Sequence, residues 1–216
     1  MRLTFFGMNN ERLGLCTDDL IIPSYYQDWP PLRGDYRVGD PLSSVAVVTL
    51  ASHIDAKGAA IVGPCKTENL GVEKVVANLI ANSNIRHLLV CGTESKGHLP
   101  GDAILALHQN GIDEEGRILG SEGAIPFIEN LPQEAISRFQ RQVQVIDRRG
   151  LTDTAEINRL VKELSCGTEP YPEPPFLVVK RRVESSVSTA SVGDVLFGCS
   201  VYLDVSAWQV AEENDV

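Results

Sequence analysis

Short apolar runs and longer helical patterns alternate along the middle of the chain. Residues 44–52 form a β-branched apolar run bounded by turn formers, which is typical of a strand buried on both faces. Residues 72–80 place valine, leucine and isoleucine at i, i+3, i+4, i+7 and i+8, which predicts one apolar stripe on a helix. By the same reasoning, further strands are expected at 58–63, 86–92, 117–120 and 143–149, and further helices at 102–109, within 125–142 and at 153–164.

The order of these elements predicts the fold class. Strands that alternate with helices are joined by crossovers and form a mainly parallel sheet. We therefore expect an α/β protein with a Rossmann-like, mainly parallel sheet flanked by helices. The expected domains are an irregular N-terminal arm (1–40), this α/β domain (41–165), a Pro-rich linker (166–176) and a small β-rich C-terminal extension (177–216).

Composition and charge narrow the class of partner. The 216 residues are 43% hydrophobic, enough for a sizeable core, and carry a formal net charge of −10. That charge argues against binding to nucleic acid or to an anionic membrane surface. Because no apolar run approaches the roughly 18 residues of a membrane span, we expect no direct membrane insertion. Five widely spaced cysteines without a CxxC pair fit a reducing, cytoplasmic location.

Three loops with a high glycine content follow predicted strands. They cover residues 63–71, 91–101 and 120–126. In an open parallel sheet, ligands bind where loops leave the carboxyl ends of the strands, and glycine lets the backbone approach a flat or bulky ligand. Taken alone, each loop is more simply explained as a turn. None contains a dinucleotide or P-loop motif, so the three together predict a site for another kind of ligand.

The histidines provide candidate metal ligands. His87 lies inside a predicted strand and His108 inside a predicted helix, so we expect both to be packing or surface residues. His98, in the sequence KGHLPG, has the best position to present its ring at the sheet edge, and His53 at a strand end is its rival. One histidine is too few for a zinc site, but it is enough for a metal that a macrocycle already holds.

A metal-free site is an alternative. Cys65 precedes a predicted helix, where the pKa of its thiol could be lowered, and His53 or His98 could then act as its base. The loops also carry acidic residues that could be acid–base groups or solvated carboxylates, namely Glu68, Glu94 and Glu122. Sequence alone does not bring the thiol and a histidine within hydrogen-bond distance. We therefore prefer the interpretation of the histidine as a metal ligand to that of Cys65 as a nucleophile.

The same loops carry a family resemblance. The sequences GPCKTEN, KGH and GAIPFIEN, within a match over roughly residues 35–165, resemble the A subunit of tetrahydromethanopterin S-methyltransferase, the corrinoid-carrying subunit of that enzyme. The resemblance implies a methyl carrier. A corrinoid (cobalamin or 5-hydroxybenzimidazolyl cobamide) would hold a methyl group on cobalt, between a methyl-tetrahydromethanopterin-type donor and a thiol acceptor such as coenzyme M. His98 in the matching loop would be the lower axial cobalt ligand.

The resemblance also implies partners and a set of cofactor-binding residues. A methyltransferase subunit would deliver the methyl group, and other subunits of a methyltransferase complex could join it. Lys96 stands where a common corrinoid motif has an aspartate that orients the histidine, so the orienting carboxylate would come from Glu94 or Asp102, or be missing. The expected cofactor-binding residues are Gly63, Pro64, Cys65, Thr67, Glu68, Gly92, Glu94, Gly97, His98, Gly123, Ala124 and Pro126, with His98 as the metal ligand.

The C-terminal segment leaves a second function open. Family members commonly end in a transmembrane helix, whereas this sequence ends in the Pro-rich stretch, a Val/Ser-rich segment and the residues EENDV. That difference favours a form that exchanges methyl groups with a separate methyltransferase. The alternative, from another functional class, is a corrinoid-free regulatory or assembly protein that docks on a methyltransferase through its C-terminal segment.

Overall fold

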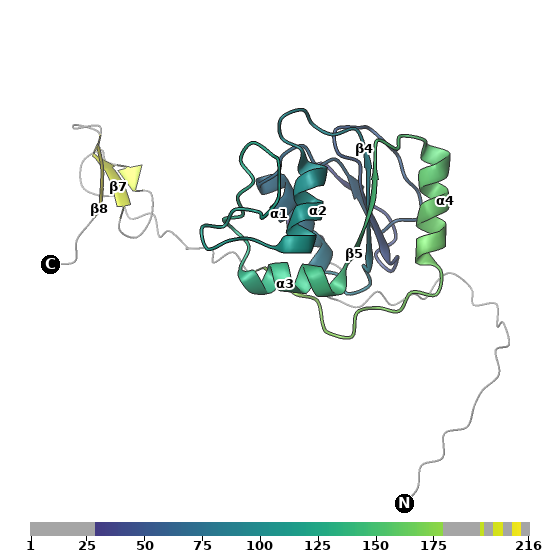
Figure 1. Cartoon of the computed structure of the whole chain (residues 1–216). Helices are drawn as coiled ribbons and strands as arrows, with labels where there is room; N and C mark the ends of the chain where they lie inside the picture. The colour runs from purple at the N-terminus through teal and green to yellow at the C-terminus, as the bar shows by residue number, and fades with distance from the viewer. Residues whose placement is uncertain (1–28, 179–194, 197–200, 205–208, 213–216) are drawn as a thin grey trace, which may run out of the picture. The chain divides into compact units, whose positions relative to one another are not determined.

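The fold is seen in a computed structural model, which describes residues 29–178, 195–196, 201–204 and 209–212. The chain divides into two compact units, Met1–Val178 and Val179–Val216, and each is described by itself. The first unit contains a five-stranded sheet with helices on both of its faces (Figure 1).

The sheet is mainly parallel, as predicted. Its strands are β1 (Arg37–Val38), β2 (Val45–Val48), β3 (Ile61–Gly63), β4 (His87–Gly92) and β5 (Gln144–Arg149), and their order across the sheet is β1-β3-β2-β4-β5. The pairs β2·β3, β2·β4 and β4·β5 are parallel, and only β1 runs antiparallel to its neighbour β3. The α/β class is therefore confirmed. Because β3 and β4 run in the same direction, the loops that follow them both lie at the carboxyl ends of the strands.

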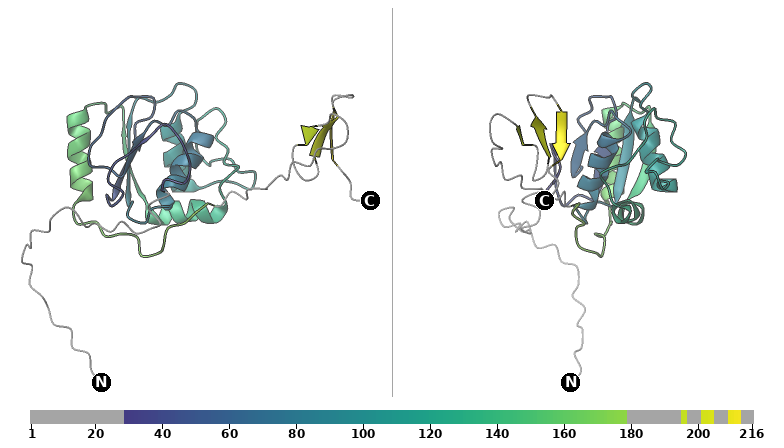
Figure 2. Two further views of the ribbon diagram at one scale, coloured as in Figure 1. Left: turned by 180° about the vertical axis from the view of Figure 1, so that it is seen from behind. Right: turned by 90° about the vertical axis from the view of Figure 1, so that its left-hand side faces the viewer.

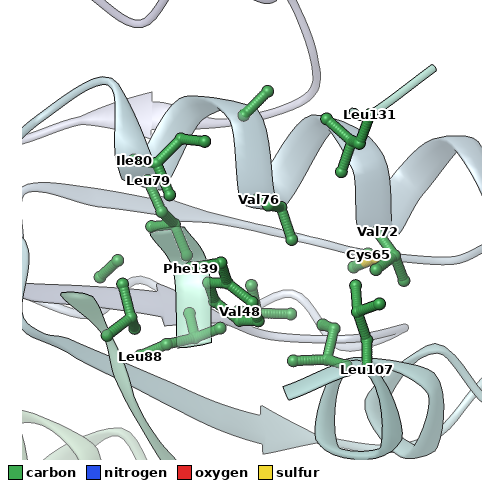
Figure 3. Packing of buried hydrophobic residues seen from close by; sticks show 14 of the residues in the cluster. Val48, Cys65, Val72, Val76, Leu79, Ile80, Leu88, Leu107, Leu131 and Phe139 are labelled. Carbon is green, nitrogen blue, oxygen red and sulfur yellow. The ribbon is translucent and has the colours of Figure 1, made fainter. Parts of the chain in front are cut away.

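Helices cover both faces of this sheet. Helices α1 (Leu70–Ile80), α2 (Pro100–Asn110) and α3 (Gln133–Gln142) lie on one face, and α4 (Thr154–Ser165) lies on the other (Figures 1 and 2). Each face has its own hydrophobic core. The larger core, between the sheet and α1 to α3, includes Val48, Leu88 and the fully buried ring of Phe139 (Figure 3).

The strand β2 shows why an uninterrupted apolar run predicts a central strand. All four of its residues are buried. Side chains of a strand alternate between faces, so Ala46 and Val48 enter the larger core while Val45 and Val47 pack in the smaller one beneath α4. A strand covered on both faces needs apolar residues at every position, and this is the predicted pattern.

The prediction of a strand at 117–120 is wrong. These residues belong to an irregular segment between α2 and α3 and make only the isolated bridges Ile112↔Ile118 and Arg117↔Phe127. Ile118 is fully buried, which explains the apolar pattern, but its N–H donates to the carbonyl of Pro126 at 2.7 Å within the segment itself. A buried loop residue and a strand residue give the same signal over so short a run.

The folded part of the chain begins earlier than predicted. Residues 29–40 were expected to belong to an irregular arm, but they include β1 and the buried Trp29, whose indole N–H donates to the carbonyl of Asn78 at 2.8 Å. These residues therefore contribute to the core and to one edge of the sheet. The rest of the expected arm, residues 1–28, lies outside the described residues.

Residues 166–176, predicted as an extended linker, pack on the domain. The buried guanidinium of Arg138 on α3 lies 2.7 Å from the carboxylate of Glu173, donates to the carbonyl of Pro174 at 2.9 Å and stacks 4.3 Å from the ring centroid of Tyr171. We call this set of contacts the Arg138 clamp. Two backbone hydrogen bonds add to it, from Tyr171 N–H to the Ser83 carbonyl (2.8 Å) and from Phe176 N–H to the Ile80 carbonyl (2.9 Å).

The C-terminal unit contains the expected β structure. Strands β6 (Val195–Leu196), β7 (Val201–Asp204) and β8 (Gln209–Glu212) form a three-stranded antiparallel sheet. Across the described parts of the chain, none of the helices has the length and apolar character that a membrane span requires.

Candidate functional site

His98 lies in the loop that connects β4 to α2. The backbone N–H groups of His98 and Leu99 both donate to the carbonyl of Ser95, which closes a tight turn. Gly97 (φ +80°) and Leu99 (φ +46°) both adopt left-handed backbone conformations. Such a conformation costs a non-glycine residue about 1 kcal/mol or more, so the surrounding contacts must hold Leu99 in place.

The imidazole of His98 pairs with a buried carboxylate. Its Nδ1 lies 2.8 Å from Oε2 of Glu68, which comes from the loop between β3 and α1. The His98 side chain is 53% exposed, whereas that of Glu68 is 1% exposed. With Nδ1–H donating to Glu68, the neutral ring keeps the lone pair of Nε2 for another ligand. This is the arrangement that metal-binding histidines commonly have.

Glu68 is held as a carboxylate by the groups around it. Burial on its own would raise the pKa of the Glu68 carboxyl, but the backbone N–H groups of Glu68 and Ile125 and the contact with His98 outweigh it and lower that pKa. The Ile125 N–H donates to Oε1 at 2.7 Å, so each carboxylate oxygen has its own partner. The carboxylate is thus available at neutral pH to accept a hydrogen bond from the ring.

The loop of residues 120–126 packs against this pair. A Cβ on Gly123 would lie 2.7 Å from the carbonyl oxygen of His98 and 2.9 Å from Cγ of Glu68, so only glycine fits there. The N–H of Ala124 donates to the carbonyl of Gly97 at 3.1 Å. The structure therefore brings together five of the predicted cofactor-binding residues, from three separate loops.

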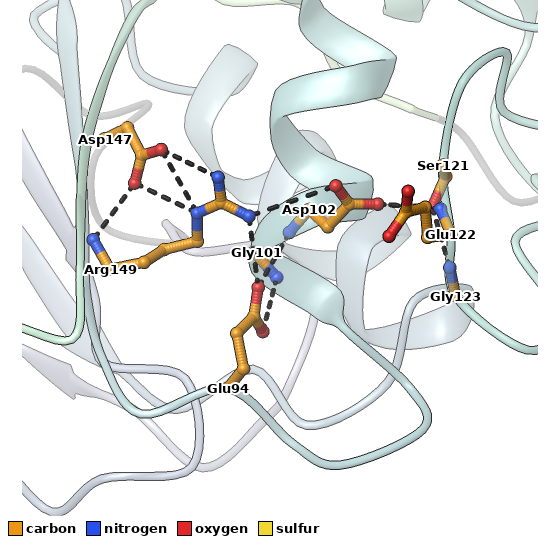
Figure 4. Close-up of polar contacts among 8 residues, drawn as sticks. All are labelled: Glu94, Gly101, Asp102, Ser121, Glu122, Gly123, Asp147 and Arg149. Atoms are coloured by element: carbon orange, nitrogen blue, oxygen red, sulfur yellow. Dashed lines mark hydrogen bonds and ion pairs between the residues drawn. The ribbon is translucent and has the colours of Figure 1, made fainter.

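A polar network fixes the start of α2, the helix that follows His98 in the chain (Figure 4). Leu99, the N-cap residue of α2, supplies no capping side chain. The carboxylate of Glu94 takes that role and accepts the N–H groups of Gly101 (3.1 Å) and Asp102 (2.9 Å). The guanidinium of Arg149, at the end of β5, lies 3.6 Å from Glu94 and 3.9 Å from Asp102. The first turn of α2 is therefore satisfied from outside the helix.

The same network reaches the loop of residues 120–126. Asp102 accepts the Ser121 hydroxyl at 3.2 Å and the Glu122 N–H at 2.8 Å (Figure 4). Glu94 and Asp102 were the expected partners of the His98 ring, but both carboxylates are used on backbone amides, and the partner is Glu68. A helix start attracts carboxylates because its free N–H groups carry partial positive charge.

Three other predicted residues come from the end of β3 and the start of the loop that follows it. Gly63, Pro64 and Cys65 line a cavity of about 190 Å³ between α1 and the sheet. The hydroxyl of Thr67 accepts the Gly71 N–H in the first turn of α1 at 3.0 Å, while the side chain of the N-cap residue Asn69 accepts the Leu70 N–H. These residues are continuous with Glu68 along the chain, and the lining of the cavity does not include His98.

Two predicted residues have a structural role that accounts for them. A Cβ on Gly92 (φ +81°) would lie 2.2 Å from the carbonyl oxygen of Thr49, so this glycine allows β4 to end against the neighbouring strand. Pro126 is buried, and its carbonyl accepts the N–H of Ile118. Both therefore help to shape the loops.

The thiol of Cys65 is not activated. Its side chain is buried, and its Sγ donates to the carbonyl of Thr67 at 3.6 Å. Burial raises the pKa of the Cys65 thiol to about 12, with smaller contributions from the charges of Glu94 and Glu68 and an opposing one from Thr67. A nucleophilic cysteine needs a lowered pKa and an accessible sulfur, so this geometry argues against the thiol alternative.

Sequence comparison assigns the chain to a family. A family model described as the A subunit of tetrahydromethanopterin S-methyltransferase matches residues 23–181. The chain belongs to this family. The family is named for one subunit of a methyltransferase, which implies that its members work with other subunits. The match confirms the resemblance that the three loops carry.

Individual relatives of the family agree with this assignment. A protein of Methanosarcina acetivorans, provisionally named as the A subunit of the methyltransferase Mtx, is 55% identical over 183 residues, which are 84% of this chain and 93% of that protein. The first of two A subunits of tetrahydromethanopterin S-methyltransferase from Methanothermobacter marburgensis is 55% identical over 142 residues, which are 63% of this chain and 60% of that protein.

The remaining histidines of this family member do not resemble His98. His108 packs edge-on against Phe139, with ring centroids 5.3 Å apart, and its Nε2 lies 2.7 Å from the carbonyl oxygen of Val143. Burial, followed by the charge of Arg86, lowers the pKa of His87, which favours a neutral ring. His53 lines a hollow of about 620 Å³ that does not include His98 but shares Gly63 and Pro64 with the cavity beside α1. In the described residues, no group of three or more histidines, cysteines and carboxylates could hold a metal ion.

Sequence reasoning missed two contributors to the site, Arg149 and the N–H of Ile125. The sequence contains a weak indication for Arg149, because this residue ends a predicted strand, and the carboxyl end of that strand lies at the same sheet edge as the glycine-rich loops. The Ile125 amide carried none, since every residue but proline has one.

Proposed function

We propose that this chain is a corrinoid-binding methyl carrier of the methyltransferase family to which it belongs. The bound corrinoid would supply a cobalt atom able to carry a methyl group. The donor proposed is of the methyl-tetrahydromethanopterin type, delivered by a partner methyltransferase subunit, and the acceptor is a thiol such as coenzyme M. Family membership supports the methyltransferase class, and the His98 site supports the choice of cofactor.

One observation carries the cofactor part of the proposal. The ring of His98 is half-exposed, its Nδ1 is bound to the buried carboxylate of Glu68, and its Nε2 keeps a lone pair directed away from that partner. A single nitrogen donor of this kind does not build a metal site from protein alone, but it suits a metal whose other positions a macrocycle fills.

The residues around His98 fit a large flat ligand. Gly97 has open space where a Cβ would stand, so the backbone beside the imidazole can be approached closely. Ile125, whose N–H donates to Glu68, and Leu70, the first residue of α1, are both more than half exposed and offer apolar surface near Glu68. The chain's own part in methyl transfer is then to hold and orient the cofactor while Glu68 keeps the ring in the metal-binding tautomer.

The test is reconstitution of the full chain with hydroxycobalamin, followed by visible spectroscopy of the wild type and of His98→Ala. We expect tight binding by the wild type and a changed axial-ligand spectrum in the variant. His53→Ala is the matched control, because it removes a histidine from a hollow whose lining does not include His98 and should leave the axial-ligand spectrum unchanged. Failure of the wild type to bind, or an unchanged spectrum in His98→Ala, would overturn the proposal.

The same experiment separates the alternative function. A corrinoid-free regulatory or assembly protein would bind no corrinoid in any redox state, yet would still be recovered together with a methyltransferase. Incubation of the corrinoid-loaded chain with methyl-tetrahydromethanopterin and the partner subunit tests the donor, since transfer of the methyl group is seen as a change in the visible spectrum.

A further inference from the structure

A hollow of about 350 Å³ lies where strands β4 and β5 begin. It is lined by the first residues of these strands, by the last turns of α2 and α3 and by Thr168 after α4. Its volume falls within the range of small-ligand sites, about 300 to 1,000 Å³. Strand β4 runs for six residues, roughly 17 Å, from this hollow toward the His98 loop. The hollow and the His98 loop are therefore at opposite ends of β4, and the hollow shares no lining residue with the cavity beside α1 or with the hollow at His53.

The charge of this hollow, which we call the Arg86 hollow, is opposite to that of the chain. Arg86 and Arg141 line it together with His87 and His108, and none of the described residues that line it is acidic. The whole chain has 29 acidic and 19 basic residues. Within the described part of the chain, neither Arg86 nor Arg141 takes part in an ion pair. Two guanidinium groups without a carboxylate partner attract an anion to this place.

The helix ends around the Arg86 hollow would repel an anion if their carbonyl groups were free, because the last turn of a helix carries partial negative charge. Side-chain donors already satisfy these carbonyls. The His108 carbonyl accepts the side-chain amide of Gln140 at 3.1 Å, and the Val143 carbonyl lies 2.7 Å from Nε2 of His108. The Gln142 carbonyl accepts the Nε–H of Arg86 at 2.9 Å. The positive charge of the hollow is therefore not cancelled by the ends of α2 and α3.

The Arg86 hollow also has donors that the protein leaves unused. Arg86 donates through Nε and Nη1 to the carbonyls of Gln142 and Glu169, and its Nη2 makes no hydrogen bond to the described residues. The exposed guanidinium of Arg141 makes none to them either. The Nδ1 atom of His87 is buried and has no hydrogen-bond partner in the described part of the chain. A buried polar atom normally has one, so these groups are available to a ligand.

The free donors favour one class of ligand. A guanidinium group presents paired N–H groups that match the oxygens of a phosphate or a carboxylate. A planar carboxylate is satisfied by one guanidinium, whereas a tetrahedral dianion can accept from donors on separate elements and balances two positive charges. We propose that the Arg86 hollow binds a phosphate group, either free phosphate or the phosphate monoester of a small molecule, through Arg86, Arg141 and the ring of His87.

The test is isothermal titration calorimetry of the full chain in phosphate-free buffer, with inorganic phosphate and glycerol 3-phosphate as probes. We expect one-to-one binding that weakens as salt is added. Arg141→Gln should raise the dissociation constant by about tenfold or more, because a charge-assisted hydrogen bond is lost. Arg33→Gln is the matched control, since it makes the same change at an exposed arginine outside the hollow. Tighter binding of glycerol 3-phosphate would assign the site to a phosphorylated small molecule, and tighter binding of inorganic phosphate to the free ion.

Nuclear magnetic resonance of the histidine rings locates the bound probe. Phosphate should shift the ring signals of His87 and His108 in the wild type but not those of His53, which lines another hollow. Absence of binding by both probes, or binding that Arg141→Gln leaves unchanged, would overturn the proposal. Binding of a hexaglutamate peptide without binding of either phosphate probe would also overturn it and would assign the hollow to an acidic segment of a partner protein. None of these measurements requires a corrinoid, so their outcome leaves the proposed function untouched.

Discussion

Glu68→Gln keeps the size of a buried side chain but changes which hydrogen bonds it can make. In the wild type, one oxygen accepts the Ile125 N–H at 2.7 Å and the other lies 2.8 Å from Nδ1 of His98. Glutamine has one oxygen, and the Ile125 amide requires it, because an unpaired buried N–H costs about 1 to 3 kcal/mol. The glutamine NH2 group then faces Nδ1, so Nδ1 must accept a hydrogen bond instead of donating one.

This reversal moves the ring proton to the nitrogen that should bind the metal. A neutral imidazole has one N–H, and once Nδ1 of His98 acts as an acceptor the proton sits on Nε2. Loss of an orienting group behind a metal-bound histidine typically weakens metal affinity by about 10- to 100-fold, which corresponds to about 1.4 to 2.8 kcal/mol. We expect an effect of this size on axial ligation in Glu68→Gln, with no loss of the fold.

The measurement is a titration of the full chain with hydroxycobalamin, in which the visible spectrum reports how much of the cobalt is bound by His98. Glu122→Gln is the matched control, because it makes the same substitution at an exposed position of the adjacent loop. If Glu68→Gln binds and ligates the corrinoid as the wild type does, the tautomer argument is refuted even where His98→Ala behaves as expected.

Three other predictions follow from burial and charge. Phe139→Ala should lower the free energy of unfolding by about 3 to 5 kcal/mol, measured by chemical denaturation, because the ring is fully buried in the larger core. Alkylation with mass mapping should modify the exposed Cys166 quickly but Cys65 only after unfolding, since burial raises the pKa of the Cys65 thiol to about 12; rapid labelling of native Cys65 would contradict this. Arg149→Met should make the free energy of unfolding depend less on pH in the acid range. The hydrogen bonds of Arg149 lower the pKa of the Asp147 carboxyl in the folded state. This lowering stabilises the fold at pH values above the ordinary aspartate pKa of about 3.9, and the stabilisation is lost as pH falls through the lower, folded-state pKa. Urea denaturation at several pH values measures the free energy of unfolding, and the same dependence on pH in Arg149→Met as in the wild type would contradict the prediction.

The parts of the fold that sequence predicted are those where burial alone determines the pattern. Strand β2 is covered on both faces and reads as an unbroken apolar run, and α1 shows its apolar stripe because one side faces the core. The segment of residues 111–132 was not predictable in this way. Its N–H groups are bonded partly to carboxylates of other elements, such as Glu73, which accepts the N–H groups of Glu129 and Asn130. Contacts of that kind leave no periodic trace in a sequence.

The candidate site was likewise predictable only in part. The position of His98 on a loop at the ligand-binding edge followed from the element order, because the carboxyl ends of parallel strands meet there. The carboxylate that pairs with the His98 ring could not be predicted from the element order. Glu94 and Asp102 are close to His98 in sequence and were the natural expectation, yet backbone amides at the start of α2 and in the adjacent loop take both carboxylates. Glu68 is 30 residues away, and only the packing of the two loops shows that it reaches the ring.

The Arg138 clamp determines where force applied to the C-terminal part of the chain would enter the domain. Residues 166–176 follow α4 directly, but from Glu169 onward their hydrogen bonds to the domain go to Ile80 at the end of α1, to Ser83 after it, to Arg86 just before β4 and to Arg138 on α3. A pull on the chain beyond Val178 therefore loads the Phe176 and Glu173 contacts first and reaches α4 only after they break. The load is carried by the layer of helices that also supports the His98 loop, so the clamp is a mechanical connection between the C-terminal chain and that layer.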